Sequence, residues 1–597
     1  MRVGVALAMV ATLGATGALA APKDRPVARA QVQGVAGPLK ADLLRAIGEE
    51  RGPPSNRIDA RRRAKVAADN ATALLRSEGY YDATVEPDIS ATDKPQPIVK
   101  IELGPRTVFG DTVVSFTGAS PDSLAVVAAQ NAIALKPGAP ARAADVLAAQ
   151  GRVVAALQAR GYADAKSDTL TPVVDHATKT MLATFKVEAG SLVRMDGIRF
   201  ETKGHTDPRF VKPLVPWKAG DVYKPSDIAE LQRRLTDTGV YDAVTVALSP
   251  TPDASGARPV VVSVADRTRH SFSFSAGYST TEGPDLDTTY SVYNVLDRAD
   301  TLTYLARAQT IDSRIGVTLS FPDFWSPSQT LSVGPDIFRD VTNAYTSTGA
   351  EFVVNLTQKY GKTSFFTRGI SLVASRVDDK ELGSIDFLAL RPLGEFSWDH
   401  TDNPLDSHHG WKAEVKAEPI ATFGDKTDPT RIVSDSAQFY LKLQTQESIY
   451  FPLWPQTTFA ARLHVGAIVG GQIPEVPASD RFFAGGGGSV RGYEYQNVGP
   501  HYADNTPQGG LSVVETSFEL RRDNLWNGLG GVLFLDSGVV GAQETPSFTH
   551  IASSVGIGAR YDLGFAPLRA DFAFPINKLS AASQSPVQVY LSIGQAF

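Results

Sequence analysis

The stretch HSFSFSAGY, residues 270–278, alternates in polarity with a period of two residues. Its apolar positions are Phe272, Phe274, Ala276 and Tyr278, and its other positions are Ser271, Ser273, Ser275 and Gly277. Successive side chains of a β-strand point to opposite faces of the sheet. The stretch therefore predicts a strand with one apolar face and one polar face.

The same alternation continues to the end of the chain. RIGVTLSF (314–321), VETSFELR (514–521) and VQVYLSIGQAF (587–597) each separate apolar from polar residues in this way. We place about 16 such segments between residues 270 and 597, a pattern typical of transmembrane β-barrels. A soluble sandwich would need a second sheet over its apolar faces, whereas a barrel leaves no unpaired sheet edge in lipid. The interpretation is a transmembrane antiparallel β-barrel at 269–597.

A repeat occupies the first half of the chain. LLRSEGYYDATV (74–85), LQARGYADAKS (157–167) and LTDTGVYDAVTV (235–246) each end a helical pattern with a glycine. Glycine adopts the left-handed conformation that terminates helices, so Gly79, Gly161 and Gly239 are expected helix stops. Alternating strands precede and follow each helical part. The pattern predicts three α+β modules at 21–104, 105–190 and 191–268.

Composition narrows the class of protein further. Residues 1–20 combine an early arginine, an apolar run and a small-residue end, which predicts a signal peptide cleaved before Ala21. We find no other apolar run near the roughly 18 residues that a membrane helix needs, so strands must do any spanning. The chain has no cysteine, which excludes disulfides and thiolate metal sites. A net charge of −6 gives no support for nucleic-acid binding.

A glycine-rich stretch interrupts the strand pattern after the eleventh segment, FAARLHVGAIV (459–469). It reads RFFAGGGGSVRGYEYQNVGP (481–500) and contains Val490, Arg491, Gly492 and Tyr493. Three repeats followed by a barrel with this VRGY loop resemble the BamA and TamA superfamily of outer-membrane assembly and translocation proteins. The repeats then resemble POTRA domains, and a count of three is similar to TamA-like members. DHTDNPLDSHHGW (399–411), FELRR and FLDSG also match, although Ser407 stands where proline is expected.

The resemblance implies a role for the loop. In the family the loop folds into the barrel lumen, and its arginine meets inward carboxylates, here Glu519 and Asp536. Alternation independently places Glu519 on the polar face of its strand. Asp536 shares the parity of Phe534, so alternation does not place it inward. The loop could be a latch that stabilises the barrel or a functional plug, and both remain open.

The resemblance also implies a function. It suggests a factor in the outer membrane of a Gram-negative bacterium, with periplasmic POTRA domains, that inserts or exports unfolded autotransporter-type client proteins. A large TamB-like partner anchored in the inner membrane is implied as well, and the terminal Phe597 resembles the insertion signal of such barrels. The alternatives are a two-partner secretion transporter that exports one exoprotein through its lumen, and a passive channel.

Enzyme and metal hypotheses find no support in the residues. None of the motifs G-x-S-x-G, H-E-x-x-H or G-x-x-x-x-G-K-[ST] is present, and His408-His409 lacks cysteine ligands. We therefore expect no catalysis, no cofactor and no metal.

Closure of the barrel would join its first and last strands. The facing candidates are Ser271, Ser273 and Ser275 in the first strand and Tyr590, Ser592 and Gly594 in the last. The serines of the first strand, and Gly594 and Ala596 of the last, do not offer the bulky cross-strand pairs that add roughly 0.2–1 kcal/mol each. The hypothesis is a weak seam that opens sideways into lipid. The alternative is that small residues simply suit a crowded lumen.

Overall fold

The structure is a computed structural model that describes residues 26–168, 170, 172–202, 204–279, 283–361, 363–426, 437–563, 567–577 and 585–593. The predicted signal peptide at 1–20, Gly594 and Phe597 lie outside the described residues. The chain forms two compact units, which are described separately. The first contains residues up to Gly197 with 217–227 and 249–259, and the second contains the rest.

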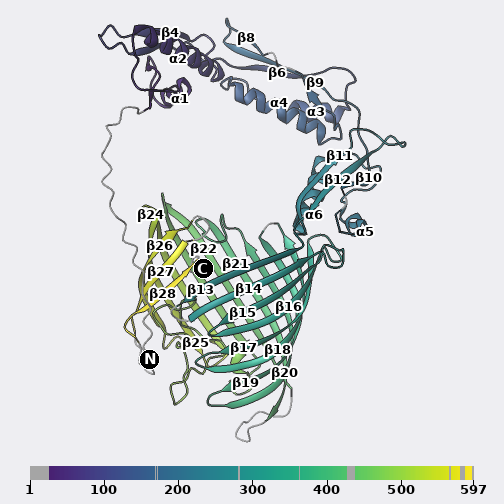
Figure 1. Cartoon of the computed structure of the whole chain (residues 1–597), viewed down its shortest axis with the longest axis vertical. Helices are drawn as coiled ribbons and strands as arrows, with labels where there is room; N and C mark the ends of the chain where they lie inside the picture. Colours follow the sequence, from purple (N-terminus) through teal and green to yellow (C-terminus); the bar gives the residue numbers. More distant parts are fainter. Residues whose placement is uncertain are drawn as a thin grey trace. The chain divides into compact units, whose positions relative to one another are not determined.

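The first repeat is a small sheet covered by two helices (Figure 1). Its elements are β1 (Pro26–Ala28), β2 (Gln31–Gln33), α1 (Pro38–Ile47), β3 (Glu49–Arg51), α2 (Arg57–Ser77), β4 (Thr84–Ile89) and β5 (Pro97–Glu102). The sheet order is β2-β5-β4, with β2 and β5 parallel, and β1 pairs with β3. Alanines of α2 and Leu43, Ile47 and Leu75 form the core between helices and sheet.

The second repeat has the same plan. Its elements are β6 (Val108–Phe116), α3 (Ser123–Ala132), α4 (Ala143–Gln158), β7 (Lys166–Ser167), β8 (Val173–Asp175) and β9 (Thr180–Glu188). The central strand β9 pairs in parallel with β6 and antiparallel with β7 and β8. Phe109, Leu157 and Phe185 are buried between the helices and this sheet.

The third repeat adds another sheet in the order β10-β12-β11. Its elements are β10 (Met195–Thr202), α5 (Pro208–Val211), the 3-10 helix η1 (Lys212–Leu214), α6 (Pro225–Asp237), β11 (Tyr241–Leu248) and β12 (Arg258–Asp266). The predicted helix stops are confirmed, because Gly79, Gly161 and Gly239 follow α2, α4 and α6 with φ of 94°, 100° and 75°. The module limits themselves, at 104, 190 and 268, stay a prediction.

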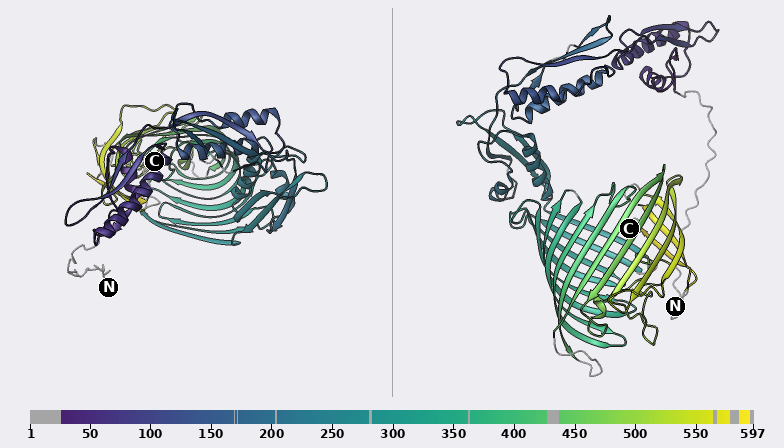
Figure 2. Two further views of the ribbon diagram at one scale, coloured as in Figure 1. Left: turned by 90° about the horizontal axis from the view of Figure 1, so that it is seen from above. Right: turned by 180° about the vertical axis from the view of Figure 1, so that it is seen from behind.

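From residue 270 onward the described chain forms one sheet of 16 antiparallel strands, which confirms the predicted number. Figure 2 shows these strands tilted and curved into a barrel. The strands are β13 (His270–Ser279), β14 (Gly283–Tyr293), β15 (Thr301–Gln309), β16 (Asp312–Pro322), β17 (Gln329–Val341), β18 (Tyr345–Tyr360), β19 (Ser364–Asp379), β20 (Gly383–Asp399), β21 (Gly410–Lys426), β22 (Gln438–Trp454), β23 (Thr457–Val469), β24 (Ser512–Trp526), β25 (Leu529–Gly541), β26 (Ala552–Asp562), β27 (Pro567–Pro575) and β28 (Gln588–Ile593).

Alternation along the strands separates an apolar outer face from a more polar interior. Large apolar side chains such as Phe272, Ile370, Phe439 and Leu533 are exposed on the outer face. An apolar band on the exterior of a transmembrane barrel contacts lipid and not water, so the exposure of these side chains has no hydrophobic cost. No helix among the described residues is long and apolar enough to cross a membrane.

Candidate functional site: the lumen loop

The predicted lumen loop connects β23 to β24, the eleventh and twelfth barrel strands, and spans residues 470–511. After the 3-10 helix η2 (Ala478–Asp480), Gly485 and Gly486 take φ of 107° and 106°. A side chain at Gly485 would have its Cβ 2.4 Å from the Glu494 carbonyl oxygen. The glycine run is therefore the tight turn that brings the VRGY segment against the barrel wall.

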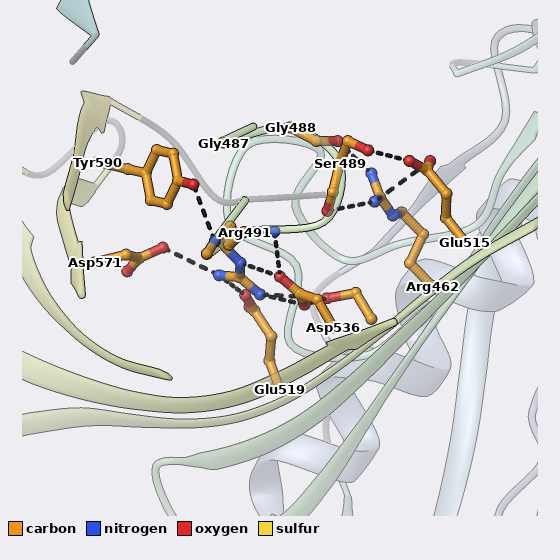
Figure 3. Close-up of polar contacts among 12 residues, drawn as sticks. Arg462, Gly487, Gly488, Ser489, Arg491, Glu515, Glu519, Asp536, Asp571 and Tyr590 are labelled. Atoms are coloured by element: carbon orange, nitrogen blue, oxygen red, sulfur yellow. Dashed lines mark hydrogen bonds and ion pairs between the residues drawn. The ribbon is translucent and has the colours of Figure 1, made fainter. Parts of the chain in front are cut away.

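Arg491 lies at the centre of a cluster of carboxylates on the inner wall (Figure 3). Its Nε and Nη2 donate to the Oδ2 and Oδ1 atoms of Asp536 at 2.6 and 2.9 Å. Its Nη1 forms an ion pair with Glu519 Oε1 at 2.7 Å and donates to Asp571 Oδ2 at 3.0 Å. Both carboxylates proposed from the sequence therefore contact Arg491, and Asp571 is an additional partner that we did not predict.

All three acids lie on the inward faces of their strands. Glu519 on β24, Asp536 on β25 and Asp571 on β27 are all at most 1% exposed. Phe534 also faces inward, and its ring centroid lies 3.5 Å from the Arg491 guanidinium carbon. An aromatic face attracts a cation. Asp536 and Phe534 therefore both point inward from β25, because both contact the Arg491 guanidinium.

Further arginines neutralise the same acids. Arg521 donates to Glu519 at 2.8 Å, and both Arg560 and Arg569 donate to Asp571. Asp536 is different, because within the described residues it forms an ion pair with Arg491 and with no other cation. Asp536 also accepts the Ser517 hydroxyl at 2.6 Å and the Arg491 backbone N–H at 3.1 Å.

The surrounding charges keep Arg491 positive despite its burial. Burial by itself disfavours the charged guanidinium, but the nearby carboxylates of Glu519 and Asp536 outweigh it and raise the pKa of Arg491 above its usual range. The side chain is therefore a permanent cation, and its fork geometry matches Asp536 in a way that a lysine could not reproduce.

The rest of the VRGY segment fixes the loop to the last strands of the barrel, β26 and β28. Val490 and Tyr493 are buried, and the Tyr493 hydroxyl donates to the Ser553 carbonyl oxygen at 2.9 Å. Gly492 has φ of 91° and donates its N–H to the Tyr590 hydroxyl at 3.0 Å. Tyr590 in turn donates to the Tyr493 carbonyl oxygen at 3.2 Å. The last described strand, β28, is thus tied directly to the loop.

A second arginine fastens the loop to another part of the wall. Arg481 Nη1 donates to Asp379 Oδ2 at 3.0 Å, at the end of β19, and to the Gln508 carbonyl oxygen at 2.9 Å. The preceding Asp480 forms an ion pair with Arg391 of β20 at 2.9 Å and accepts the Tyr440 hydroxyl of β22 at 2.5 Å. We did not predict this contact, although the Asp-Arg pair directly before two phenylalanines was a usable signal.

The seam residues are placed only in part. The described sheet begins with β13 and ends with β28, and hydrogen-bonded pairing within the described residues does not join these two strands. Their Cα atoms nevertheless approach within 8 Å. Tyr590 is 3% exposed and faces the loop, whereas Ser273 and Ser275 are exposed. No cluster of three or more metal-binding side chains occurs in the described residues.

The comparisons with known proteins agree with this geometry. Residues 259–597 match the Omp85 superfamily domain, so the chain belongs to the Omp85 superfamily. It is 24% identical over 491 residues to the outer membrane protein assembly factor BamA of Neisseria meningitidis serogroup B, covering 76% of this chain and 59% of that protein. The chain thus spans about three fifths of the length of this relative.

A solved structure shares the fold. The crystal structure of BamA from Haemophilus ducreyi lacking POTRA domains 1–3 matches with a TM-score of 0.68 at 18% identity, covering 82% of this chain and 99% of that one. The predicted class, a BamA/TamA-type barrel with α+β modules of the POTRA kind, is confirmed. The barrel accordingly lies in the outer membrane of a Gram-negative bacterium, with the POTRA-like modules in the periplasm.

Proposed function

We propose that this protein is a TamA-like factor that inserts or exports autotransporter-type clients through a laterally opening barrel, without a catalytic step. The observation that carries the proposal is the seam. The wall is shallow there, because β13 has 10 residues and β27 has 9, whereas β20, β21 and β22 have 17 each. Fewer backbone hydrogen bonds then hold the region next to the seam, where a client strand could pair with an exposed edge.

The lumen loop gives this seam a control point. Tyr590 of β28 bonds to Gly492 and Tyr493, while Arg491 bonds to β24, β25 and β27. Movement of β28 away from β13 would therefore disturb the VRGY segment. A loop that occupies the lumen also argues against a passive channel.

The N-terminal modules would receive clients and partners. Strands β2, β6 and β11 lie at the edges of their sheets, and an edge strand offers free backbone groups to an added strand. We propose that unfolded outer-membrane clients, and a TamB-like protein anchored in the inner membrane, bind at such edges.

A disulfide across the seam tests the proposal. The chain has no cysteine, so pairs such as Ser271→Cys or Ser273→Cys with Ser592→Cys report on the seam alone. Ser592 is a better choice than Tyr590, whose hydroxyl bonds to the loop. A disulfide needs Cα atoms about 4.4–6.8 Å apart, so the scan also reports the register. We expect at least one pair to crosslink and the crosslinked protein to stop assembling an autotransporter-type client in proteoliposomes until reductant is added.

The matched control is a disulfide between strands that are already paired. The hydroxyl oxygens of Ser347 on β18 and Ser375 on β19 lie 3.0 Å apart, so Ser347→Cys/Ser375→Cys should crosslink without loss of activity. Client assembly at the normal rate with a fully crosslinked seam would reject lateral opening. Export through the lumen, as in a two-partner secretion transporter, would then be the better explanation.

A further inference from the structure

A groove of about 560 Å³ lies on the lipid-facing surface of β24, β25 and β26. Its floor is Gly531, which has no side chain and pairs across the sheet with Arg522 and Ala559. The neighbouring row of outward residues, Leu520, Leu533 and Ile557, forms one apolar wall. The missing side chain at Gly531 therefore leaves a hollow beside this apolar row.

The groove lies at the membrane interface. It reaches Trp454 and Leu525, which stand beside the short turns between β22 and β23 and between β24 and β25. Tryptophan is enriched where a barrel meets the lipid headgroups, and Trp454 and Trp526 are 63% and 72% exposed here. An apolar groove on this surface faces acyl chains rather than water.

One cation stands at the end of the groove. Arg522 donates to the Pro455 carbonyl oxygen and to the Thr457 hydroxyl at 2.8 Å. Within the described residues no carboxylate lies within 4 Å of it, so these contacts leave its charge uncompensated. Arg376, exposed at another groove on the outer surface, differs because Asp386 neutralises it through two hydrogen bonds.

The position of the groove along the barrel indicates which leaflet of the outer membrane it faces. Outer-membrane barrels have short turns on the periplasmic side and long loops outside. The turns beside the groove contain two residues each, whereas the lumen loop at the opposite end spans residues 470–511. Glycerophospholipids form the periplasmic leaflet, and their phosphate is the anion that an interfacial arginine attracts.

We propose that this groove binds one glycerophospholipid of the periplasmic leaflet, with an acyl chain over Gly531 and the phosphate at Arg522. The inference depends on the outer-membrane barrel and not on the proposed client activity. The lipid would sit on the strands whose inner faces carry Glu519 and Asp536. The bound lipid and the Arg491 cluster would therefore contact opposite faces of the same two strands, β24 and β25.

Native mass spectrometry of the full chain in a non-ionic detergent, titrated with dioleoyl phosphatidylglycerol, tests the site. We expect one lipid to be retained most strongly. Arg522→Gln should weaken this retention about tenfold, the loss of one charge-assisted hydrogen bond. Gly531→Leu should abolish it, because the new side chain fills the groove. Its Cβ would lie 3.0 Å from the flexible end of Leu525 and 3.9 Å from the Gly558 carbonyl oxygen, so the sheet can accept it.

Two control variants act elsewhere on the outer surface. Arg376→Gln changes the neutralised arginine of the other groove. Gly394→Leu adds a side chain to β20 at the outward parity of Leu390, where nothing lies within 4 Å of the Cβ position. Both variants should retain the lipid. Heat-modifiable migration on a gel verifies that every variant is folded. Equal retention in all variants, or equal loss in the controls, overturns the site. Displacement by lipid A or by inorganic phosphate alone, at the same concentration, overturns the assignment to a glycerophospholipid.

Discussion

The lumen loop contacts the barrel wall through two arginines, Arg481 and Arg491, whose surroundings differ. Arg491 contacts acids on three strands, Glu519, Asp536 and Asp571, all on the side of the barrel that leads to the last strand. Arg481 contacts one acid, Asp379, and otherwise donates within the loop itself, to the carbonyl oxygens of Val476 and Gln508 and to the Tyr502 hydroxyl.

The acids differ as well. Asp379 accepts backbone N–H groups of Glu381 and Leu382 and the Tyr502 hydroxyl, so it keeps donors without Arg481. Asp536 has no second cation among the described residues and depends on Arg491. The comparison teaches that Arg481 joins the loop to one strand and otherwise shapes the loop itself, whereas Arg491 joins the loop to three strands. Variants at the two positions should therefore separate folding of the loop from function of the barrel.

The largest effect is expected for Arg491→Ala. Removing it leaves Asp536 buried and unpaired, which costs about 3–5 kcal/mol for a fully buried pair. We expect the barrel to migrate as a heat-resistant species but to lose assembly activity in a complementation assay. Arg491→Ala/Asp536→Asn, which removes the stranded charge, should recover most of the stability without the activity. Full activity of the single variant would show that the contact is only structural.

Arg481→Ala should be milder. The substitution leaves the carbonyl oxygens without these donors, whereas the Asp379 carboxylate keeps its other partners. The expected loss of folding stability is about 1–3 kcal/mol. Limited proteolysis should detect a loosened loop between residues 470 and 511, while client assembly is only reduced. If Arg481→Ala abolishes activity as completely as Arg491→Ala, the distinction between the two arginines fails.

Gly492→Ala should disturb the VRGY segment through the backbone. Gly492 has φ of 91°, and a Cβ there would lie 2.9 Å from the Ser554 Cβ. A left-handed non-glycine residue costs about 1–2 kcal/mol before any clash is counted. Gly488→Ala is the matched control, because nothing lies within 4 Å of its Cβ position. Thermal unfolding of both variants measures the difference, and equal midpoints would contradict the geometry.

The smallest effect concerns the turn between β20 and β21, away from the loop. A hydrogen bond from His408 Nε2 to Asp523 at 3.0 Å raises the pKa of His408 from 6.5 to about 9. A raised pKa means that the contact stabilises the fold fully below pH 6.5 and is lost as the pH rises through 9. Hydrogen exchange of residues 400–410 should therefore accelerate toward alkaline pH beyond its intrinsic rate. His408→Asn should remove this extra dependence.

Local pattern was enough for the framework of the molecule. Alternation with a period of two is a property of each strand alone, so it indicated the barrel, its strand number and the inward position of Glu519. Helix stops at Gly79, Gly161 and Gly239 are equally local, because they depend on one residue's φ. The position of the loop after the eleventh strand followed from the same count.

The partners of the two arginines were decided by the tertiary structure. Alternation left the side of Asp536 open, because an apolar residue of the same parity, Phe534, would be expected to face lipid. Phe534 faces inward because the Arg491 guanidinium stacks on its ring. Asp571 and Tyr590 lie 80 and 98 residues from their partners in the VRGY segment, and Asp379 lies 102 residues from Arg481. Such contacts exist only after the sheet has curved and the loop has entered the lumen. The sequence by itself determined the strands and, where polarity alternates cleanly as at Glu519, the face of each side chain. Closure of the barrel decided the side of Asp536 and which inward side chains meet.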